Sequence, residues 1–219
     1  MKTQLNLSQW FHLRLCHWPE ISTQNCSSHD PEERLLASQI EQLTCPLARH
    51  HRDERRSGPK SHWAGTLVAE SLLRAFSCPR ASQFSDGSFG VFYAYDSVKT
   101  AAGELMRELT PLLAETVQVD LELTAKIEWM TPLKPLVDFE KSLDQDQCSP
   151  ATQLDFARQI VKSQGNGIYF RTTANPIGRG IALLRQDVCG PLTEDGYLRF
   201  IWNGEHQQFC GSFKMQFVY

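Results

Sequence analysis

The sequence lacks a basic surplus, a long apolar run and any closely spaced pair of cysteines. Its 22 Lys and Arg residues against 25 Asp and Glu give a formal net charge of −3, whereas nucleic-acid-binding domains usually carry an excess of basic residues. No stretch approaches the roughly 18 consecutive apolar residues that a membrane-spanning helix requires. These absences predict a protein that contacts neither nucleic acid nor membrane.

The first residues, MKTQLN, also lack the apolar core of a secretory signal, so we expect a cytoplasmic protein. The seven cysteines are scattered without a C-x-x-C pair. An odd number at irregular spacing argues against a disulfide framework. No set of Cys and His residues has the spacing of a standard zinc site, so we expect no metal.

Two common nucleotide-binding motifs are missing as well. Neither G-x-G-x-x-G nor G-x-x-x-x-G-K-[ST] occurs, so the standard dinucleotide-binding and P-loop folds have no support. What is present is ordinary for a globular protein, because 41% of the 219 residues are hydrophobic and 21% are charged. A chain of this length can bury a core without disulfide or metal staples.

Helical and strand periodicities alternate along the chain and then give way to a run of strands. Apolar residues spaced i, i+3, i+4 and i+7 predict a helix over 97–109, ended by Thr110-Pro111. Further helices are predicted over 30–43, 62–76 and 149–161.

Period-two alternation over 117–129 predicts a strand with one buried and one solvated face. Shorter strands are predicted over 89–95, 168–170, 181–184, 197–202 and 209–217. Asn203-Gly204 has the composition of a two-residue hairpin turn. This order favours an α+β fold with a mixed or antiparallel sheet core and flanking helices. We expect residues 1–57 to form a helical N-terminal extension packed on a domain of residues 58–219.

Pattern alone offers few candidates for chemistry. Glu104 lies off the apolar stripe of its predicted helix, which favours a solvated glutamate. Tyr93 lies in a predicted strand, where packing is its usual role. Thr172 follows a strand end, a position at which site residues are common.

A resemblance to a known family adds to these candidates. Residues 83–94 read QFSDGSFGVFYA, which resembles the stretch R-F-S-D-G-S-F-G-V-F-Y-A of RES domain proteins. Residues 97–104 are similar to the T-A-x-x-E helix of that family. Residues 167–172 (GIYFRT) stand where the family has G-[IV]-x-Y-P-S, and residues 197–204 resemble its closing Y-x-W-[DN]-G hairpin. The resemblance covers roughly residues 58–213.

The resemblance implies a fold like that of ADP-ribosyltransferases and an enzyme that consumes NAD. Members of the family cleave the nicotinamide–ribose bond by hydrolysis, by phosphorolysis with phosphate as co-substrate, or by transfer of ADP-ribose. NAD is then the substrate, with no other cofactor and no metal. Many members are toxins neutralised by an Xre-like antitoxin, which is the protein partner that the resemblance implies.

The resemblance also implies a role for several residues. Glu104 would stabilise the positively charged ribose formed as nicotinamide leaves. Tyr93 would stack on nicotinamide, and Thr172 would hydrogen-bond the substrate. The implied substrate-binding residues are Gln83, Phe84, Ser85, Phe170, Arg171 and Arg80.

Three positions depart from the family pattern. Gln83 replaces an arginine and therefore has neither charge nor a planar fork for the pyrophosphate. Thr172 replaces a serine, and Phe170 replaces a tyrosine. The arginines that could approach the phosphates instead are Arg80, Arg171 and Arg179. Three interpretations stay open: an NAD-cleaving toxin, a RES-like binding module without turnover, and a mono-ADP-ribosyltransferase that modifies a cellular protein.

Overall fold

The computed structural model describes residues 2–3, 9–16, 69–116, 120–142 and 149–216. The helix predicted over 30–43 lies outside these residues, as does the first part of the helix predicted over 62–76. No helix in the described part of the chain is both long and apolar enough to cross a membrane.

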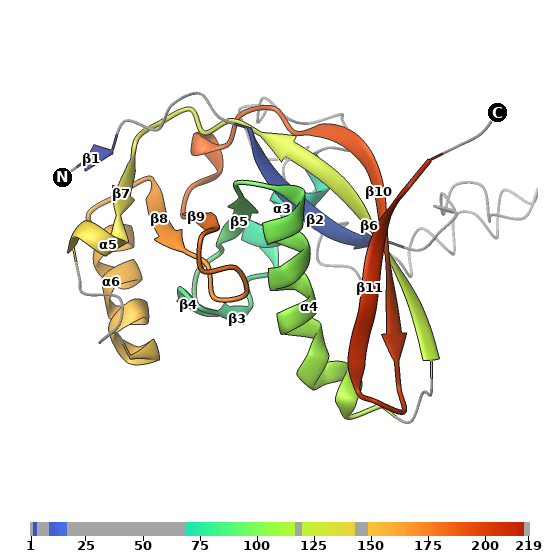
Figure 1. The fold of residues 1–219 in the computed structure, drawn as a ribbon. Helices are drawn as coiled ribbons and strands as arrows, with labels where there is room; N and C mark the ends of the chain where they lie inside the picture. The colour runs from blue at the N-terminus through green and yellow to red at the C-terminus, as the bar shows by residue number, and fades with distance from the viewer. Residues whose placement is uncertain (1, 4–8, 17–68, 117–119, 143–148, 217–219) are drawn as a thin grey trace, which may run out of the picture.

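One nine-stranded sheet organises the molecule, with strand order β1-β7-β8-β9-β5-β2-β6-β10-β11 (Figure 1). Its strands are β1 (Lys2–Thr3), β2 (Trp10–Cys16), β5 (Phe92–Tyr95), β6 (Asp120–Met130), β7 (Leu136–Asp138), β8 (Gly167–Arg171), β9 (Arg179–Leu183), β10 (Thr193–Asn203) and β11 (Gln208–Met215). The β7–β8 pair is parallel, and the other neighbours in this sheet are antiparallel. This mixed sheet with flanking helices confirms the predicted α+β class.

Helices and one small hairpin flank the sheet. They are α3 (Ala69–Ser77), α4 (Val98–Ala114), α5 (Phe139–Ser142), α6 (Pro150–Lys162), the 3₁₀ turn η2 (Gln186–Val188), and the hairpin of β3 (Ala81–Ser82) and β4 (Ser85–Asp86). In Figure 1, α4 lies in front of the sheet, between α6 on one side and the long β10–β11 hairpin on the other.

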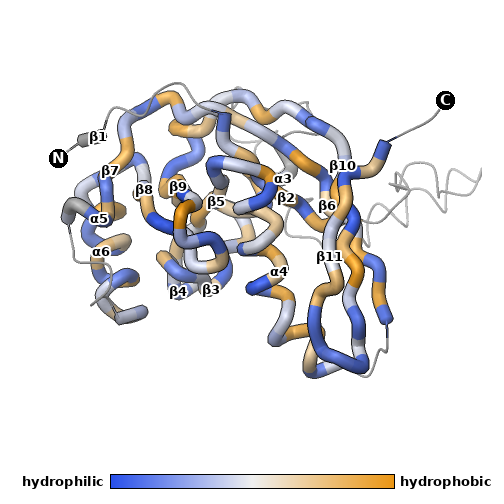
Figure 2. Tube along the Cα trace, in the orientation of Figure 1, coloured by the Kyte–Doolittle hydropathy of each residue, from blue (hydrophilic) through white to orange (hydrophobic). Residues whose placement is uncertain are grey.

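Both faces of the sheet carry a core, because successive residues of a strand point to opposite faces. Along β9, Ile181 belongs to a cluster around Trp10. Its neighbour Ala182 belongs to a cluster around Phe84 and Phe170. A third cluster lies beneath α4. Hydrophilic residues gather instead at the tip of the β10–β11 hairpin (Figure 2).

Helix α4 begins where the sequence predicts but ends later. The Ser97 hydroxyl caps it by accepting a hydrogen bond from the Thr100 N–H at 3.1 Å. The predicted stop at Thr110-Pro111 is wrong, since the helix continues through Pro111 to Ala114. A proline this close to the C-terminus removes a single backbone hydrogen bond, which the last turn tolerates.

Strand β2 corrects the expectation for the N-terminal residues. Residues 10–16, assigned from sequence to a helical extension, form a strand between β5 and β6 in the interior of the sheet. Trp10 packs into the core on one face and Leu13 into the core on the other. A strand buried on both faces needs no strict alternation, so its sequence carries a weak strand signal.

The second face of β6 is exposed at Asp120 and Glu122, as predicted, but buried from Thr124 onwards. Lys126 and Glu128 are 3% and 0% exposed, although the alternating pattern predicted a wet face. Partners from other strands accompany these charges: Lys126 Nζ lies 2.9 Å from Glu194 Oε1, and Arg14 Nε lies 3.7 Å from Glu128 Oε1. Such pairing offsets part of the cost of burying charge.

The β10–β11 turn also differs from expectation. It contains four residues, 204–207, instead of the predicted two. The Asn203 side-chain oxygen accepts a hydrogen bond from the His206 N–H at 2.7 Å. Gln207 adopts a left-handed φ of 51°, a conformation that this longer loop requires and that a non-glycine residue adopts at some cost.

Candidate active site

Three consecutive segments, within residues 81–114, meet a loop from much later in the chain on one face of the sheet. They are α4, strand β5, the β3–β4 hairpin, and the loop 172–178 between β8 and β9 (Figure 1). Each brings one residue predicted from sequence: Glu104, Tyr93, Gln83 and Thr172.

Glu104 is buried, with 3% of its surface exposed, so the solvated glutamate favoured by pattern is wrong. Its Oε1 accepts hydrogen bonds from the backbone N–H groups of Thr173 and Ala174, each at 2.7 Å. Its Oε2 accepts from Arg107 Nε at 2.9 Å. Three donors therefore fix the carboxylate, and two of them come from a loop about 70 residues further along the chain.

The loop 172–178 is fastened to the first turns of α4. The Thr172 hydroxyl donates to the Asn175 carbonyl at 2.7 Å. The Asn175 amide in turn donates to Thr100 Oγ1 at 3.0 Å. Gly178 lies so close to α4 that a Cβ there would be 2.7 Å from Thr100 Cγ2. Thr172 is 4% exposed, and its hydroxyl makes its hydrogen bond within the loop.

Tyr93 holds the β3–β4 hairpin against strand β5. Its hydroxyl lies 2.8 Å from Ser82 Oγ and accepts a hydrogen bond from the Phe84 N–H at 3.1 Å. Burial raises the pKa of Tyr93 to about 12, so the phenol stays protonated. Its ring meets Phe170 edge-on, with centroids 6.3 Å apart.

Three of the predicted substrate-binding residues lie beneath the site rather than at its surface. Phe84 and Phe170 are 0% and 1% exposed, and their rings pack edge-on at 5.0 Å. Ser85 is also buried, and its hydroxyl donates to the Phe89 carbonyl at 2.6 Å. Gln83, in the turn of the same hairpin, is half-buried. These contacts shape the hairpin, and of its three residues 83–85 only Gln83 is partly exposed.

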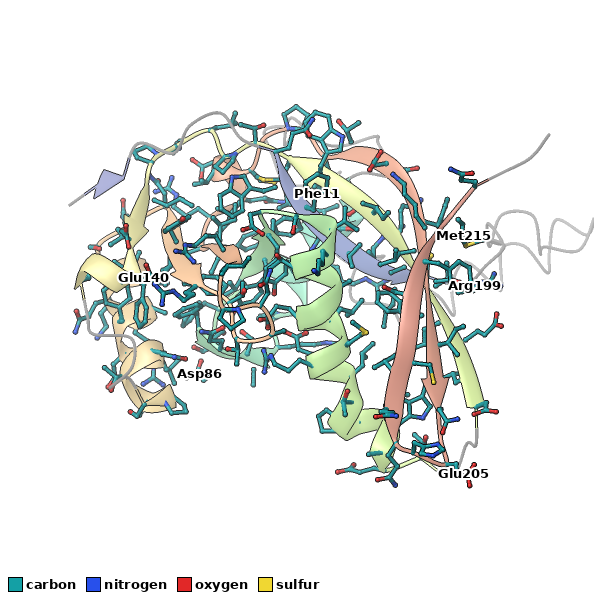
Figure 3. All side chains as sticks on the ribbon, viewed as in Figure 1. Phe11, Asp86, Glu140, Arg199, Glu205 and Met215 are labelled. Carbon is teal, nitrogen blue, oxygen red and sulfur yellow. The ribbon has the colours of Figure 1, made fainter. Side chains whose placement is uncertain are left out.

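The arginines considered from sequence lie around this centre. Arg80 is exposed just before β3. Arg171 forms an ion pair with Glu140 of α5 at 2.8 Å, and Arg179 Nη1 donates to the Gly178 carbonyl at 3.2 Å. Figure 3 shows Glu140 on the α6 side of α4. The guanidinium that touches Glu104 is Arg107, which sequence analysis did not select.

The comparison with known families gives a match over residues 52–203 to the sequence model of the RES domain. The chain belongs to the RES domain family. A search of curated proteins returns no match. The matched region of this RES domain contains α4, β5, the β3–β4 hairpin and the loop 172–178, whereas β2 precedes it.

Three polar residues of this RES domain that were not predicted from its sequence accompany Glu104. Arg107 and Glu108 follow Glu104 by three and four residues, a spacing that places side chains on one face of a helix. Desolvation raises the pKa of Glu108, Arg107 partly offsets that effect, and the negative charge of Glu104 adds to it. Tyr95 follows Tyr93 by two residues in β5 and so points to the same face. These two spacings are the sequence signals that could have found them.

A metal site has no support among the described residues. They contain no group of three or more His, Cys, Asp or Glu side chains placed to hold an ion. The polar groups gathered at this site are carboxylates, phenols, a guanidinium and the backbone N–H groups of one loop. Such a set suits an organic substrate that carries both positive and negative charge.

Proposed function

We propose that this RES domain cleaves the bond between nicotinamide and ribose in NAD. The observation that carries the proposal is the Glu104 carboxylate, which is 3% exposed and held by three donors. As nicotinamide leaves, positive charge develops on the ribose. A carboxylate already fixed in place stabilises that charge without reorganisation, which lowers the barrier.

The two oxygens of Glu104 have different roles in this proposal. Oε1 is held by backbone groups and sets the position of the carboxylate. Oε2 is held by Arg107, whose side chain is 44% exposed and therefore free to turn towards an anionic substrate. Such a movement releases Oε2 towards the ribose, while the guanidinium meets phosphate, for which its planar fork is suited.

The aromatic side chains of β5 would contact the other end of the substrate. The nicotinamide ring of NAD is a cation, and it is attracted to the faces of aromatic rings and to nearby carboxylates. Tyr93 supplies an aromatic ring, and Glu104 and Glu108 supply negative charge. Water or phosphate would then accept the ADP-ribosyl group, and an Xre-like antitoxin is the partner that would neutralise the activity.

A binding module without turnover is the second candidate, and Gln83 favours it. A charge-assisted hydrogen bond contributes about 1.5–3 kcal/mol. Losing the arginine of the family pattern therefore weakens binding roughly tenfold to a hundredfold. A site weakened to that degree could retain NAD while catalysing poorly.

The test incubates purified protein with NAD, with and without phosphate, and resolves the products by chromatography. We expect loss of NAD with release of nicotinamide, and a phosphate requirement would indicate phosphorolysis. Bound but uncleaved NAD would favour the binding module. Label from NAD left on other proteins of a lysate would indicate ADP-ribosyl transfer.

The decisive variant is Glu104→Gln. It keeps one oxygen for the Thr173 and Ala174 N–H groups but removes the charge, so we expect a rate at least about a hundredfold lower with the fold intact. Glu122→Gln on β6, an exposed residue paired with Arg199, is the matched control and should retain full activity. Full activity in Glu104→Gln would contradict the proposed role.

A further inference from the structure

Tyr95 occupies a central place in the floor of the site. It lies in β5, and its backbone partners are Gly180 on β9 and Phe11 on β2. The side chain is half-buried and packs against two clusters, the one beneath α4 and the one around Phe170. Its ring therefore packs both against residues of α4 and against the cluster that contains Phe170 of β8.

Gly180 makes room for an aromatic floor beside Tyr95. The residue pairs with Tyr95 on one side and with Phe170 on the other. A Cβ at Gly180 would lie 2.4 Å from Phe170 Cζ, so the Phe170 ring covers the glycine. Phe170, Gly180 and Tyr95 thus form a row across three strands, with an aromatic ring at each end.

The Tyr95 ring packs against the apolar side of α4, and the charged residues of that helix act on its hydroxyl. Burial is the main reason that the pKa of Tyr95 is raised well above its ordinary value. The negative charges of Glu108 and Glu104 raise it further, whereas Arg107 lowers it. A phenol whose pKa is raised in this way stays protonated, and it can both donate and accept a hydrogen bond.

The other hydroxyls around the site already have partners. The Tyr93 hydroxyl bonds to Ser82 and to the backbone of Phe84. The Thr172 hydroxyl donates to Asn175. Over the described ranges of the chain, the Tyr95 hydroxyl makes no hydrogen bond. Because a partly buried tyrosine hydroxyl usually finds a partner, this one is suited to a ligand.

We propose that the Tyr95 hydroxyl donates a hydrogen bond to a hydroxyl of the nicotinamide-side ribose of NAD. The inference rests on the proposed function and adds a substrate contact to it. A sugar hydroxyl can accept from the Tyr95 phenol and donate its own proton to the carboxylate of Glu104 or Glu108. Tyr95 then supplies the substrate-facing hydroxyl, a role that the resemblance implied for Thr172.

The experiment compares wild type with Tyr95→Phe, which removes one oxygen and keeps the ring. NAD and its two analogues lacking either the 2′ or the 3′ hydroxyl of the nicotinamide ribose are the probes. Affinity is measured by calorimetry and kcat/KM by nicotinamide release. For NAD we expect kcat/KM about tenfold lower in Tyr95→Phe, the size of one lost hydrogen bond. For one of the two analogues the loss should disappear, because the partner hydroxyl is already absent.

Tyr169→Phe is the matched control. Tyr169 lies in β8 but packs edge-on against Trp10 in the core of the opposite face, at 6.0 Å. We expect that variant to handle all three ligands as wild type does. The ratio of kcat/KM for NAD to kcat/KM for an analogue, measured on one preparation, does not depend on the fraction of that preparation that is folded. A partly unfolded Tyr95→Phe therefore still gives an answer.

The outcomes separate the two proposals. Wild-type protein that neither binds nor cleaves NAD would overturn the proposed function, and the Tyr95 contact with it. Wild-type protein that turns over NAD, together with a Tyr95→Phe variant that loses nothing, would overturn the Tyr95 contact alone. An equal loss on NAD and on both analogues would do the same, because it would show that the phenol acts on the structure and not on the ribose.

Discussion

Gln83 is the residue at which this site departs furthest in charge from the RES pattern. It is half-buried in the turn of the β3–β4 hairpin, one residue before the Phe84 N–H that bonds to Tyr93. The hairpin is further tied to α6 by the ion pair of Asp86 with Arg158, at 2.6 Å. The backbone that would carry an arginine is therefore firmly placed, and only the charge is absent.

Replacing Gln83 by arginine should strengthen NAD binding about tenfold, the gain expected from one charge-assisted contact to phosphate. Calorimetry at two ionic strengths measures it, and the gain should shrink at high salt because screening weakens it. Gln208→Arg, at the exposed start of β11, adds the same charge away from the site and should change nothing. Equal affinity in Gln83→Arg and wild type would show that the phosphates lie elsewhere.

At the scale of elements, strand β2 contacts the candidate site through His12. His12 donates from Nδ1 to the Tyr93 carbonyl at 2.8 Å, and its ring lies 4.5 Å from that of Phe92. Burial lowers the pKa of His12 from 6.5 to about 4. The folded protein therefore holds this histidine neutral at pH values where an unfolded chain would protonate it.

The stability of the protein should fall as the pH drops from 6.5 to about 4. Over that range the unfolded chain takes up a proton at His12 that the folded chain excludes. The free energy of unfolding therefore decreases by up to about 3 kcal/mol. Urea unfolding at several pH values measures it. In His12→Gln, which can still donate to the Tyr93 carbonyl but cannot titrate, this part of the slope should be missing. Identical slopes in both proteins would contradict the burial of a neutral histidine.

At the scale of the whole molecule, the sheet depends on residues that precede the matched RES region. Strand β2 lies between β5 and β6, and its Trp10 and Leu13 belong to the cores on opposite faces. Removing a central strand exposes two strand edges and both cores at once.

A chain that begins at residue 58 should therefore fail to fold, although residues 58–219 contain nearly all of the family match. Circular dichroism during heating should show no cooperative transition. A chain that begins at residue 9 loses, of the residues that the structure describes, the short edge strand β1, and should still unfold cooperatively. Cooperative melting of the shorter chain would show that β5 and β6 can pair without β2.

Local sequence patterns predicted a large part of the fold and the identity of the central residues of the candidate site. Helical spacing predicted α4 and α6, and alternation predicted β6. The RES-like motif over residues 83–104 predicted the roles of Tyr93 and Glu104. Each of these signals is local, because periodicity reports which side of one segment is apolar.

The surroundings of those residues were decided by tertiary structure. Glu104 is buried because the loop after β8 brings two N–H groups to it. Lys126 is buried because Glu194 pairs with it from another strand. Such partners lie about 70 residues away in the chain, so no local pattern contains them. The sequence by itself determined elements such as α4, α6 and β6 and the charged group at the centre of the candidate site, whereas packing between distant segments decided whether that group meets solvent or backbone.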